Sequence, residues 1–186
     1  MSDERARLFV ALELSDRVVL DLIDWRAGAV SGIEGVRLVA PEDLHVTLCF
    51  LGWQGVGEID AIGRACGAVA GSGVASLQVG EPVWLPRRRP RVLAVGLSDL
   101  EGVLGRVQGA LSDVLVRGGW YEAQAREYLA HVTVARLGRA ARVPASRARS
   151  LETPRRLTFE GSTVTLYRSR LSPTGARYEA LASVEL

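Results

Sequence analysis

The sequence predicts a mixed, largely antiparallel α+β fold that is built as a duplication. Strand-like and helix-like segments alternate along 186 residues, a length typical of one domain. The chain closes on two strand-like segments joined by a turn signal, which favours an antiparallel sheet over a doubly wound parallel one. One strand-like tetrapeptide that begins with histidine occurs twice. We therefore expect residues 1–186 to form a single two-lobed domain, built as a pseudo-twofold duplication.

The first half of the chain predicts a strand, a helix, two strands and a second helix. Apolar, β-rich residues define the first strand, and Ser15 caps an amphipathic helix that reaches Trp25. In the segment from Leu44 to Leu51, one face is expected to pack in the core while the other is polar. The buried face is predicted to hold Val46, Leu48 and Phe50, and the polar face His45, Thr47 and Cys49. The expected elements are strands at 7–12, 36–39 and 44–51, and helices at about 15–25 and 58–70.

The second half predicts a hairpin, a long helix, another histidine strand and a closing hairpin. Residues 98–101 match a capping box before a helix whose apolar face runs to Leu115. Residues 172–175 are a turn signal. The expected elements are strands at 76–85, 91–97, 129–135, 156–167 and 177–186, a helix at about 100–115, and a loop with a short helix at 138–151.

Composition narrows the classes of function. The 23 basic residues are all arginine, so no lysine can form a Schiff base or a nucleotidyl adduct. A formal net charge of +2 lacks the basic excess of a protein that coats nucleic acid. No apolar run reaches the ~18 residues of a membrane span, and no secretion signal is evident, so we expect a cytoplasmic location without membrane contact. Cys49 and Cys66 are interpreted as core residues.

The two histidines of the chain occupy matching frames, His45-Val46-Thr47-Leu48 and His131-Val132-Thr133-Val134, 86 positions apart (131 − 45). Because side chains alternate along a strand, His and Thr share one face in each frame. Histidine exchanges protons near neutral pH, and a pair can divide the roles of acid and base. The frames therefore predict an acid–base site.

Hydrolysis of a cyclic phosphodiester requires the groups that these frames supply. One imidazole can activate water while the other protonates the leaving oxygen. The hydroxyls of Thr47 and Thr133 can donate to the phosphoryl oxygens, and Arg136 can add positive charge. Strict alternation would put Arg136 on the wrong face, so its role requires a bulge or a strand end there.

Other interpretations stay open for several groups. A metal site is the main rival for the histidines, but neither frame carries a carboxylate, cysteine or second histidine at ligand spacing, so we predict no metal and no cofactor. Trp84, Trp120 and Tyr121 can stack on bases or pack in the core. Five arginines are candidate RNA contacts, although each can equally be solvated surface charge. They are Arg87 and Arg89, which lie between two prolines, Arg91, which follows the second proline, and Arg168 and Arg170.

The frames and their flanks resemble the bacterial and archaeal RNA 2′,3′-cyclic phosphodiesterases of the two-histidine phosphoesterase superfamily, the LigT-like proteins once called 2′-5′ RNA ligases. The resemblance rests on residues 7–12, 44–52, 90–92, 130–136 and 166–171, and on Tyr178. Ala130 stands where a proline commonly precedes the second histidine, and Val134 replaces a usual leucine. The chemical groups themselves are intact.

The resemblance implies a bilobal fold in which two mainly antiparallel sheets, each with one His-x-Thr frame, face a central cleft with helices packed outside. It also implies metal-independent opening of a 2′,3′-cyclic phosphate at an RNA end to a 2′-phosphate. On the family pattern His45 is the acid for the 3′ oxygen and His131 the base for water, although the two roles can be exchanged because the frames are alike. Thr47, Thr133 and Arg136 bind the phosphate. Reversible 2′-5′ RNA ligation at the same site and a non-catalytic module that binds RNA ends are the alternatives. The expected partners are RNA ends or small cyclic nucleotides, with no obligate protein partner and a monomeric state.

Overall fold

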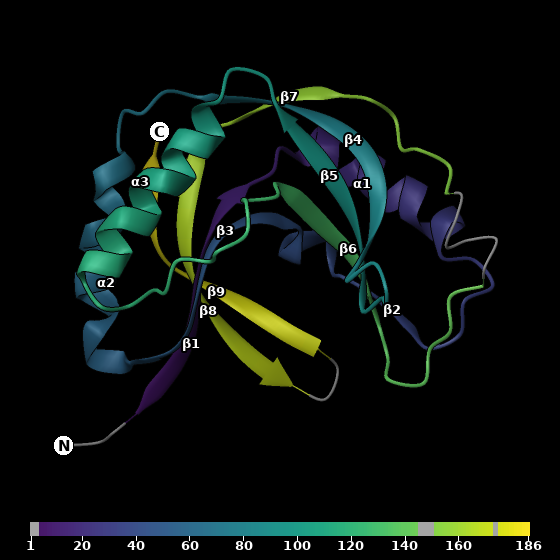
Figure 1. Ribbon diagram of the computed structural model, residues 1–186, viewed down its shortest axis with the longest axis horizontal. Helices are drawn as coiled ribbons and strands as arrows, with labels where there is room; N and C mark the ends of the chain where they lie inside the picture. Colours follow the sequence, from purple (N-terminus) through teal and green to yellow (C-terminus); the bar gives the residue numbers. More distant parts are fainter. Residues whose placement is uncertain (1–3, 145–150, 173–174) are drawn as a thin grey trace.

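The strands of this chain join into one curled antiparallel sheet with helices on its outer side (Figure 1). The computed structural model describes residues 4–144, 151–172 and 175–186. The strands are β1 Arg5–Glu13, β2 Val36–Leu38, β3 His45–Gly55, β4 Ala75–Leu85, β5 Val92–Asp99, β6 His131–Leu137, β7 Thr158–Gly161, β8 Thr163–Ser172 and β9 Gly175–Glu185. The helices are α1 Asp16–Ala29, α2 Ile59–Cys66 and α3 Val103–Arg117, with short 3₁₀ turns at Pro41–Asp43, Val56–Glu58 and Gly67–Val69.

The sheet has the strand order β7-β4-β5-β6-β3-β1-β8-β9, and β2 pairs with β6. The α+β class and the antiparallel pairing are thus confirmed. The family resemblance implied two sheets, but the described strands form one, because β3 and β6 pair at Val46 and Val132 and connect the two halves. The proposed duplication into two lobes stays a prediction.

Each histidine strand contains a bulge three residues beyond its histidine. Thr47 pairs with Ala11 and Cys49 with Val10, so Leu48 is the extra residue in β3. A bulge places two successive residues against one partner and shifts the alternation that follows. Cys49 therefore turns into the core and Phe50 outward, with 43% of its surface exposed. The alternation predicted for these two residues was wrong, whereas the interpretation of Cys49 as a core residue is confirmed.

The same shift occurs in β6. Thr133 pairs with Ala94 and Ala135 with Leu93, so Val134 is the extra residue. Val134 and Ala135 are both buried, and the exposed Arg136 returns to the face that carries His131 and Thr133. The bulge that a role for Arg136 requires is therefore present.

The core lies between the sheet and the helices. Figure 1 shows α2 and α3 side by side against one flank of the sheet and α1 against the other. The apolar face of α3 is buried as predicted, through Val103, Leu104, Val107, Leu111 and Leu115. Both cysteines are buried, which raises the pKa of the Cys66 thiol to about 11.

Three boundaries differ from the prediction. The expected capping box fails because β5 continues to Asp99 and α3 begins after Gly102, whose φ of 70° is left-handed. The Asp99 carboxylate instead accepts a hydrogen bond from the Gly105 N–H at 2.8 Å. The predicted strand 156–167 divides into β7 and β8. No helix lies at 138–144 or at 151, while positions 145–150 of the expected short helix and 173–174 of the expected turn fall outside the described residues.

Candidate active site

The register between β3 and β6 gathers the four predicted polar groups on one face of the sheet. The strands are antiparallel and pair at Val46 and Val132, both completely buried. Because side chains alternate along a strand, the residues on either side of this pair leave the sheet on its other face. These are His45 and Thr47 on β3, and His131 and Thr133 on β6. Both His-x-Thr frames therefore point to the same side of the sheet.

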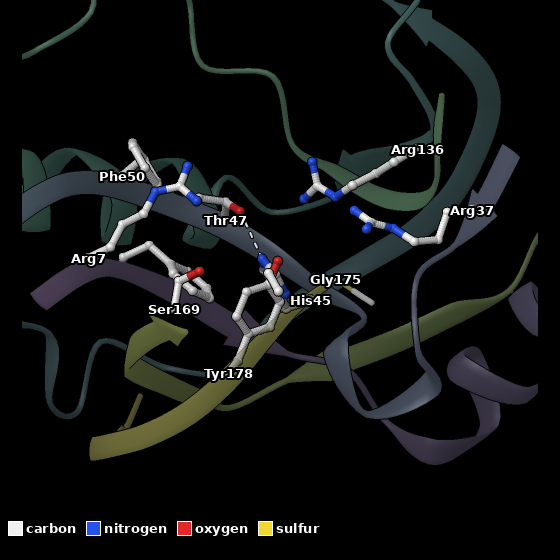
Figure 2. Close-up of a pocket in the computed structure, with 11 residues that line it drawn as sticks. Arg7, Arg37, His45, Thr47, Phe50, Arg136, Ser169, Gly175 and Tyr178 are labelled. Atoms are coloured by element: carbon white, nitrogen blue, oxygen red, sulfur yellow. Dashed lines mark hydrogen bonds between the residues drawn. The ribbon is translucent and has the colours of Figure 1, made fainter. Parts of the chain in front are cut away.

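Both imidazoles are held in the same way by the backbone. The Nδ1 atom of His45 lies 2.8 Å from the Asp43 carbonyl oxygen, and that of His131 lies 2.8 Å from the Leu129 carbonyl oxygen. A carbonyl oxygen can only accept, so each Nδ1 carries the proton and donates it. In the neutral ring Nε2 then carries no proton and can accept one. In His45 it lies 3.0 Å from the Thr47 hydroxyl (Figure 2).

Aromatic rings enclose His45. Its ring centroid lies 4.9 Å from that of Phe9 and 5.3 Å from that of Tyr178, and Phe9 also stacks on Tyr167 at 5.2 Å. Loss of solvent around the imidazole, with a smaller contribution from the positive charges of Arg136 and His131, lowers the pKa of His45 to about 4. His45 is therefore neutral at neutral pH in the ligand-free protein.

A cavity of about 230 Å³ opens beside His45. Of the predicted site residues, His45, Thr47 and Arg136 line it, whereas His131 and Thr133 lie on the neighbouring strand outside its wall. Figure 2 shows Arg37 and Arg136 reaching in from one side, across from Arg7 and Phe50. The cavity thus joins one histidine frame to three guanidinium groups, a setting suited to an anion.

Eight further residues of the wall were not predicted as site residues from the sequence. They are Arg7, Phe9, Arg37, Phe50, Ser169, Gly175, Ala176 and Tyr178. Arg7 lies over the Phe50 ring, with its guanidinium carbon 4.7 Å from the ring centroid. Most of the polar and aromatic ones fall in segments that resemble the known family, but no pattern in the sequence pointed to Arg37.

Comparison with known proteins identifies relatives along the whole chain. No protein-family profile matches it. It is 28% identical over 179 residues to an Archaeoglobus fulgidus protein named RNA 2′,3′-cyclic phosphodiesterase, covering 96% of this chain and 99% of the relative. An Escherichia coli protein of the same name is 27% identical, covering 96% and 95%. The chain is a homologue of the RNA 2′,3′-cyclic phosphodiesterases.

Solved structures support this homology. E. coli LigT in its apo form superposes with a TM-score of 0.81 at 25% identity, covering 98% of both chains. A Thermus thermophilus protein, TT0787, superposes with a TM-score of 0.79 at 24% identity, covering 97% of both chains. LigT complexed with 3′-AMP gives 0.79 at 25% identity, covering 98% of this chain and 99% of LigT. The curled antiparallel sheet is thus the LigT fold.

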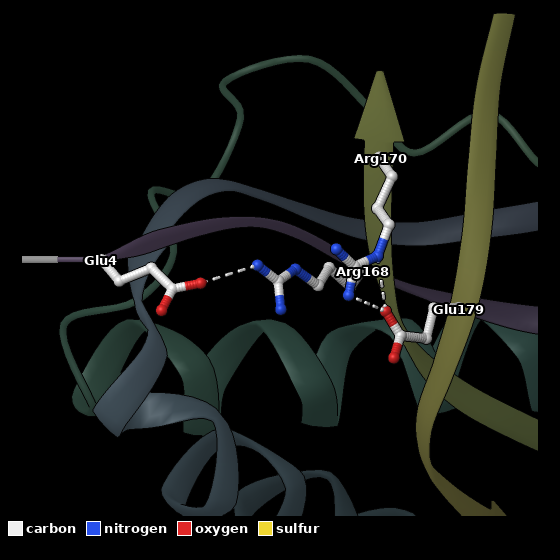
Figure 3. A network of polar contacts seen from close by, with 4 residues as sticks. All are labelled: Glu4, Arg168, Arg170 and Glu179. Atoms are coloured by element: carbon white, nitrogen blue, oxygen red, sulfur yellow. Dashed lines mark hydrogen bonds and ion pairs between the residues drawn. The ribbon is translucent and has the colours of Figure 1, made fainter. Parts of the chain in front are cut away.

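Two predicted RNA contacts of this phosphodiesterase homologue lie away from the cavity. Along β8, Ser169 lines the cavity, so the alternating Arg168 and Arg170 point to the opposite face. Figure 3 shows Arg168 paired with Glu4 at 3.2 Å and Arg170 paired with Glu179 at 2.8 Å. Of the two interpretations left open, surface charge fits both arginines, because strand alternation turns them away from the cavity.

The other candidate RNA contacts, three arginines and three aromatic residues, also lie outside the cavity wall. Arg87, Arg89 and Arg91 are exposed in the loop between β4 and β5, outside the cavity wall. The Arg91 carbonyl accepts from the Leu137 N–H at 2.8 Å, so this loop adjoins the end of β6. Of the aromatic candidates, Trp84 is buried in the core. Trp120 and Tyr121 are partly buried and pack against the core cluster.

The described residues contain no group of three or more His, Cys, Asp or Glu side chains placed to hold a metal ion. Within the same residues, no helix has the length and apolar character needed to cross a membrane.

Proposed function

We propose that this protein hydrolyses 2′,3′-cyclic phosphate ends of RNA to 2′-phosphate ends by proton transfer through two imidazoles, without a metal ion. The observation that carries the proposal is the pairing of the two His-x-Thr frames on one sheet face beside an arginine-lined cavity. The names of the relatives support the same reaction. LigT complexed with 3′-AMP supports a nucleotide as the ligand of this cavity.

In the proposed reaction, water attacks the phosphorus atom and the bond from phosphorus to the 3′ oxygen breaks. The Nε2 atom of His131 takes a proton from the water, and the Nε2 atom of His45 gives one to the departing 3′ oxygen. Each such transfer typically contributes ~10²–10⁴-fold to the rate. The hydroxyls of Thr47 and Thr133 and the guanidinium of Arg136 stabilise the charge on the phosphoryl oxygens.

This assignment requires His45 to gain a proton before it can act as the acid. Its pKa of about 4 makes it neutral in the free protein. An anionic phosphodiester in the cavity favours the charged form of the imidazole and raises that pKa. Substrate binding and protonation of His45 are therefore coupled, which restricts acid catalysis to the occupied site.

The central test uses purified protein, excess chelator and an oligonucleotide that ends in a 2′,3′-cyclic phosphate. We expect the 2′-phosphate product, and a loss of ~10²–10⁴-fold in kcat/KM for His45→Ala and for His131→Ala. Arg117→Met, at the exposed end of α3, serves as the matched control and should keep the wild-type rate. Turnover retained in either histidine variant, or abolished by the chelator, would refute the proposal.

A second substrate assigns the roles of the two histidines. If sulfur replaces the 3′ oxygen, the leaving thiolate needs no proton. We then expect His45→Ala to recover most of its lost rate and His131→Ala to remain slow. Recovery in His131→Ala instead would show that the roles are exchanged. Incubation of an RNA that ends in a 2′,3′-cyclic phosphate with an RNA that has a 5′-hydroxyl, assayed for joined product, tests the ligation, while the cytoplasmic location and the monomeric state stay predictions.

A further inference from the structure

Arg37 and Arg136 face each other directly across two strands. They are register partners in the antiparallel pair of β2 and β6, so their side chains leave the sheet on the same face. Like charges at such a position are destabilising. Among the described residues, neither guanidinium has an ion-pair partner. An anion between or beside them would remove this repulsion.

A second cavity of about 140 Å³ adjoins the first at these two arginines. Both cavities share Arg37, Arg136 and Tyr178, so the two guanidinium groups stand at the passage between them. Arg177 lines only the second cavity. It pairs with Glu42 at 3.4 Å on an exposed surface, and such a pair contributes little. Arg177 can therefore turn from Glu42 to a more highly charged ligand.

The electrostatics of the second cavity favour an anion despite one carboxyl in its wall. Asp43 is buried and accepts a hydrogen bond from the Tyr178 N–H. Burial raises the pKa of this carboxyl, an effect that Arg177 and Arg136 oppose. Three arginines against one aspartate give the wall a formal charge of +2 (3 − 1). Closely spaced guanidinium groups of this kind bind phosphate through paired hydrogen bonds.

We propose that Arg37 and Arg177 form a second phosphate subsite, which binds the phosphate on the 5′ oxygen of the nucleoside whose cyclic phosphate reacts beside His45. This inference rests on the proposed function and names its substrate class. The preferred substrates are nucleotides that carry a phosphate at both ends of the ribose. The 3′ end of an RNA strand has such a phosphate in its last internucleotide linkage, and a free 5′-phosphorylated nucleotide also has one.

Three substrates separate these cases: adenosine 2′,3′-cyclic phosphate, the same compound with a 5′-phosphate, and the dinucleotide ApA with a 2′,3′-cyclic end. For the wild-type protein we expect kcat/KM to be about 10- to 100-fold higher for the last two, the range of a charge-assisted contact. In Arg37→Met this ratio should fall to about one, and in Arg177→Met it should fall in part. Arg117→Met removes the same charge from the exposed end of α3 and should keep the ratio.

Several outcomes would overturn the subsite. The wild-type protein would show no preference for the 5′-phosphate, or Arg37→Met would lose the same factor on all three substrates, which would assign Arg37 to the reacting phosphate. A preference for the dinucleotide without one for the 5′-phosphorylated nucleotide would assign the gain to the preceding nucleoside.

Binding without turnover keeps this inference separate from the proposed function. Calorimetry compares adenosine 2′,5′-bisphosphate with 2′-AMP, which differ only in the 5′-phosphate. We expect the bisphosphate to bind at least about tenfold tighter to the wild-type protein and equally tightly to Arg37→Met. If this difference is found in a protein that hydrolyses no cyclic phosphate, the proposed function fails and the anion subsite stands. If hydrolysis is found and the affinities are equal, the subsite alone fails.

Discussion

At the scale of single residues, the cavity beside His45 contains one hydroxyl with unused hydrogen-bonding capacity. Ser169 is 6% exposed and lines this cavity, and within the described residues its Oγ atom is buried without a hydrogen-bond partner. An unsatisfied buried polar group costs about 1–3 kcal/mol. A ligand that accepts a hydrogen bond from Ser169 would remove this cost, so the residue is suited to binding substrate at the expense of stability.

The first prediction tests whether Ser169 favours substrate binding over folding stability. Ser169→Ala should leave the free energy of unfolding unchanged or raise it by about 1 kcal/mol, and should raise KM by about five- to tenfold for the loss of one hydrogen bond. Urea denaturation and steady-state kinetics measure the two effects. A lower stability together with an unchanged KM would contradict the assignment.

The second prediction concerns the protonation of His45. Burial favours the neutral imidazole, so the pKa should lie near 4 in the free protein and rise when 2′-AMP occupies the cavity, because the anion favours the charged form. Titration of the histidine ring signals by NMR, with His45→Gln to assign them, measures both values. The unfolded chain binds this proton near pH 6.5, so the contribution of His45 to stability should decrease as the pH falls from about 6.5 toward 4.

Residue patterns predicted part of this site, for physical reasons. The His-x-Thr frames could be recognised because alternation within a strand is a local property. Arg37 could not, because it meets Arg136 only through the pairing of β2 with β6, across 99 positions (136 − 37). The aromatic ring of Phe50 was assigned to the core because apolar residues alternate up to Leu48, and the bulge there reverses the pattern.

At the scale of elements, the bulge in β6 depends on a buried arginine in α1. Arg26 is 4% exposed, and its Nη1 atom donates to the Val39 carbonyl oxygen and, at 3.5 Å, to that of Val134, the extra residue of the bulge. The Val39 N–H donates to the same Val134 oxygen at 3.1 Å. These contacts satisfy the carbonyl that the bulge displaces from the ladder. We therefore expect Arg26 to help position Arg136, two residues further on.

The third prediction tests this coupling. Arg26→Met keeps the length of the side chain but removes its hydrogen bonds to the Val39 and Val134 carbonyl oxygens, so stability should fall by about 1–3 kcal/mol. If the bulge aims Arg136, KM should also rise, and Arg136→Ala should cost less in the Arg26→Met background than in the wild type. A double-mutant cycle on kcat/KM measures the difference. Additive effects would mean that Arg26 only supports the fold.

Features of the helices and strands that local sequence determines were predicted correctly. Features that depend on tertiary contacts were missed. The apolar face of α3 was predicted because its spacing is helical. Its start was misplaced because Asp99 stays in β5, paired with Leu77, and reaches the helix only through its carboxylate. The need for a bulge before Arg136 could be inferred from the sequence, but its support by Arg26 could not, since that contact joins residues 108 positions apart.

At the scale of the whole molecule, the two halves of the sheet meet where the chemistry is proposed. In the described part of the chain, β3 and β6 pair at one position, Val46 with Val132, and the remaining strands attach on either side. The paired frames predicted that both histidine strands contribute to one site, but the family resemblance implied separate sheets. The pairing of the two strands could not be inferred, because the residues at the seam are as apolar as those of any core strand. The distance between the two imidazoles therefore depends on the packing of this single pair.

The last prediction tests that dependence with two matched truncations. Val132→Ala removes two buried methyl groups at the seam, and Val164→Ala removes the same groups from β8, where Val164 is 1% exposed and pairs with Leu12. Each should lower the free energy of unfolding by about 2 kcal/mol. Only Val132→Ala should also lower kcat, by about tenfold or more, because a small displacement of catalytic groups is costly in rate. Urea denaturation and single-turnover kinetics on both variants separate stability from geometry. Equal kcat values in the two variants would mean that the strands on either side, and not the seam, fix the positions of His45 and His131.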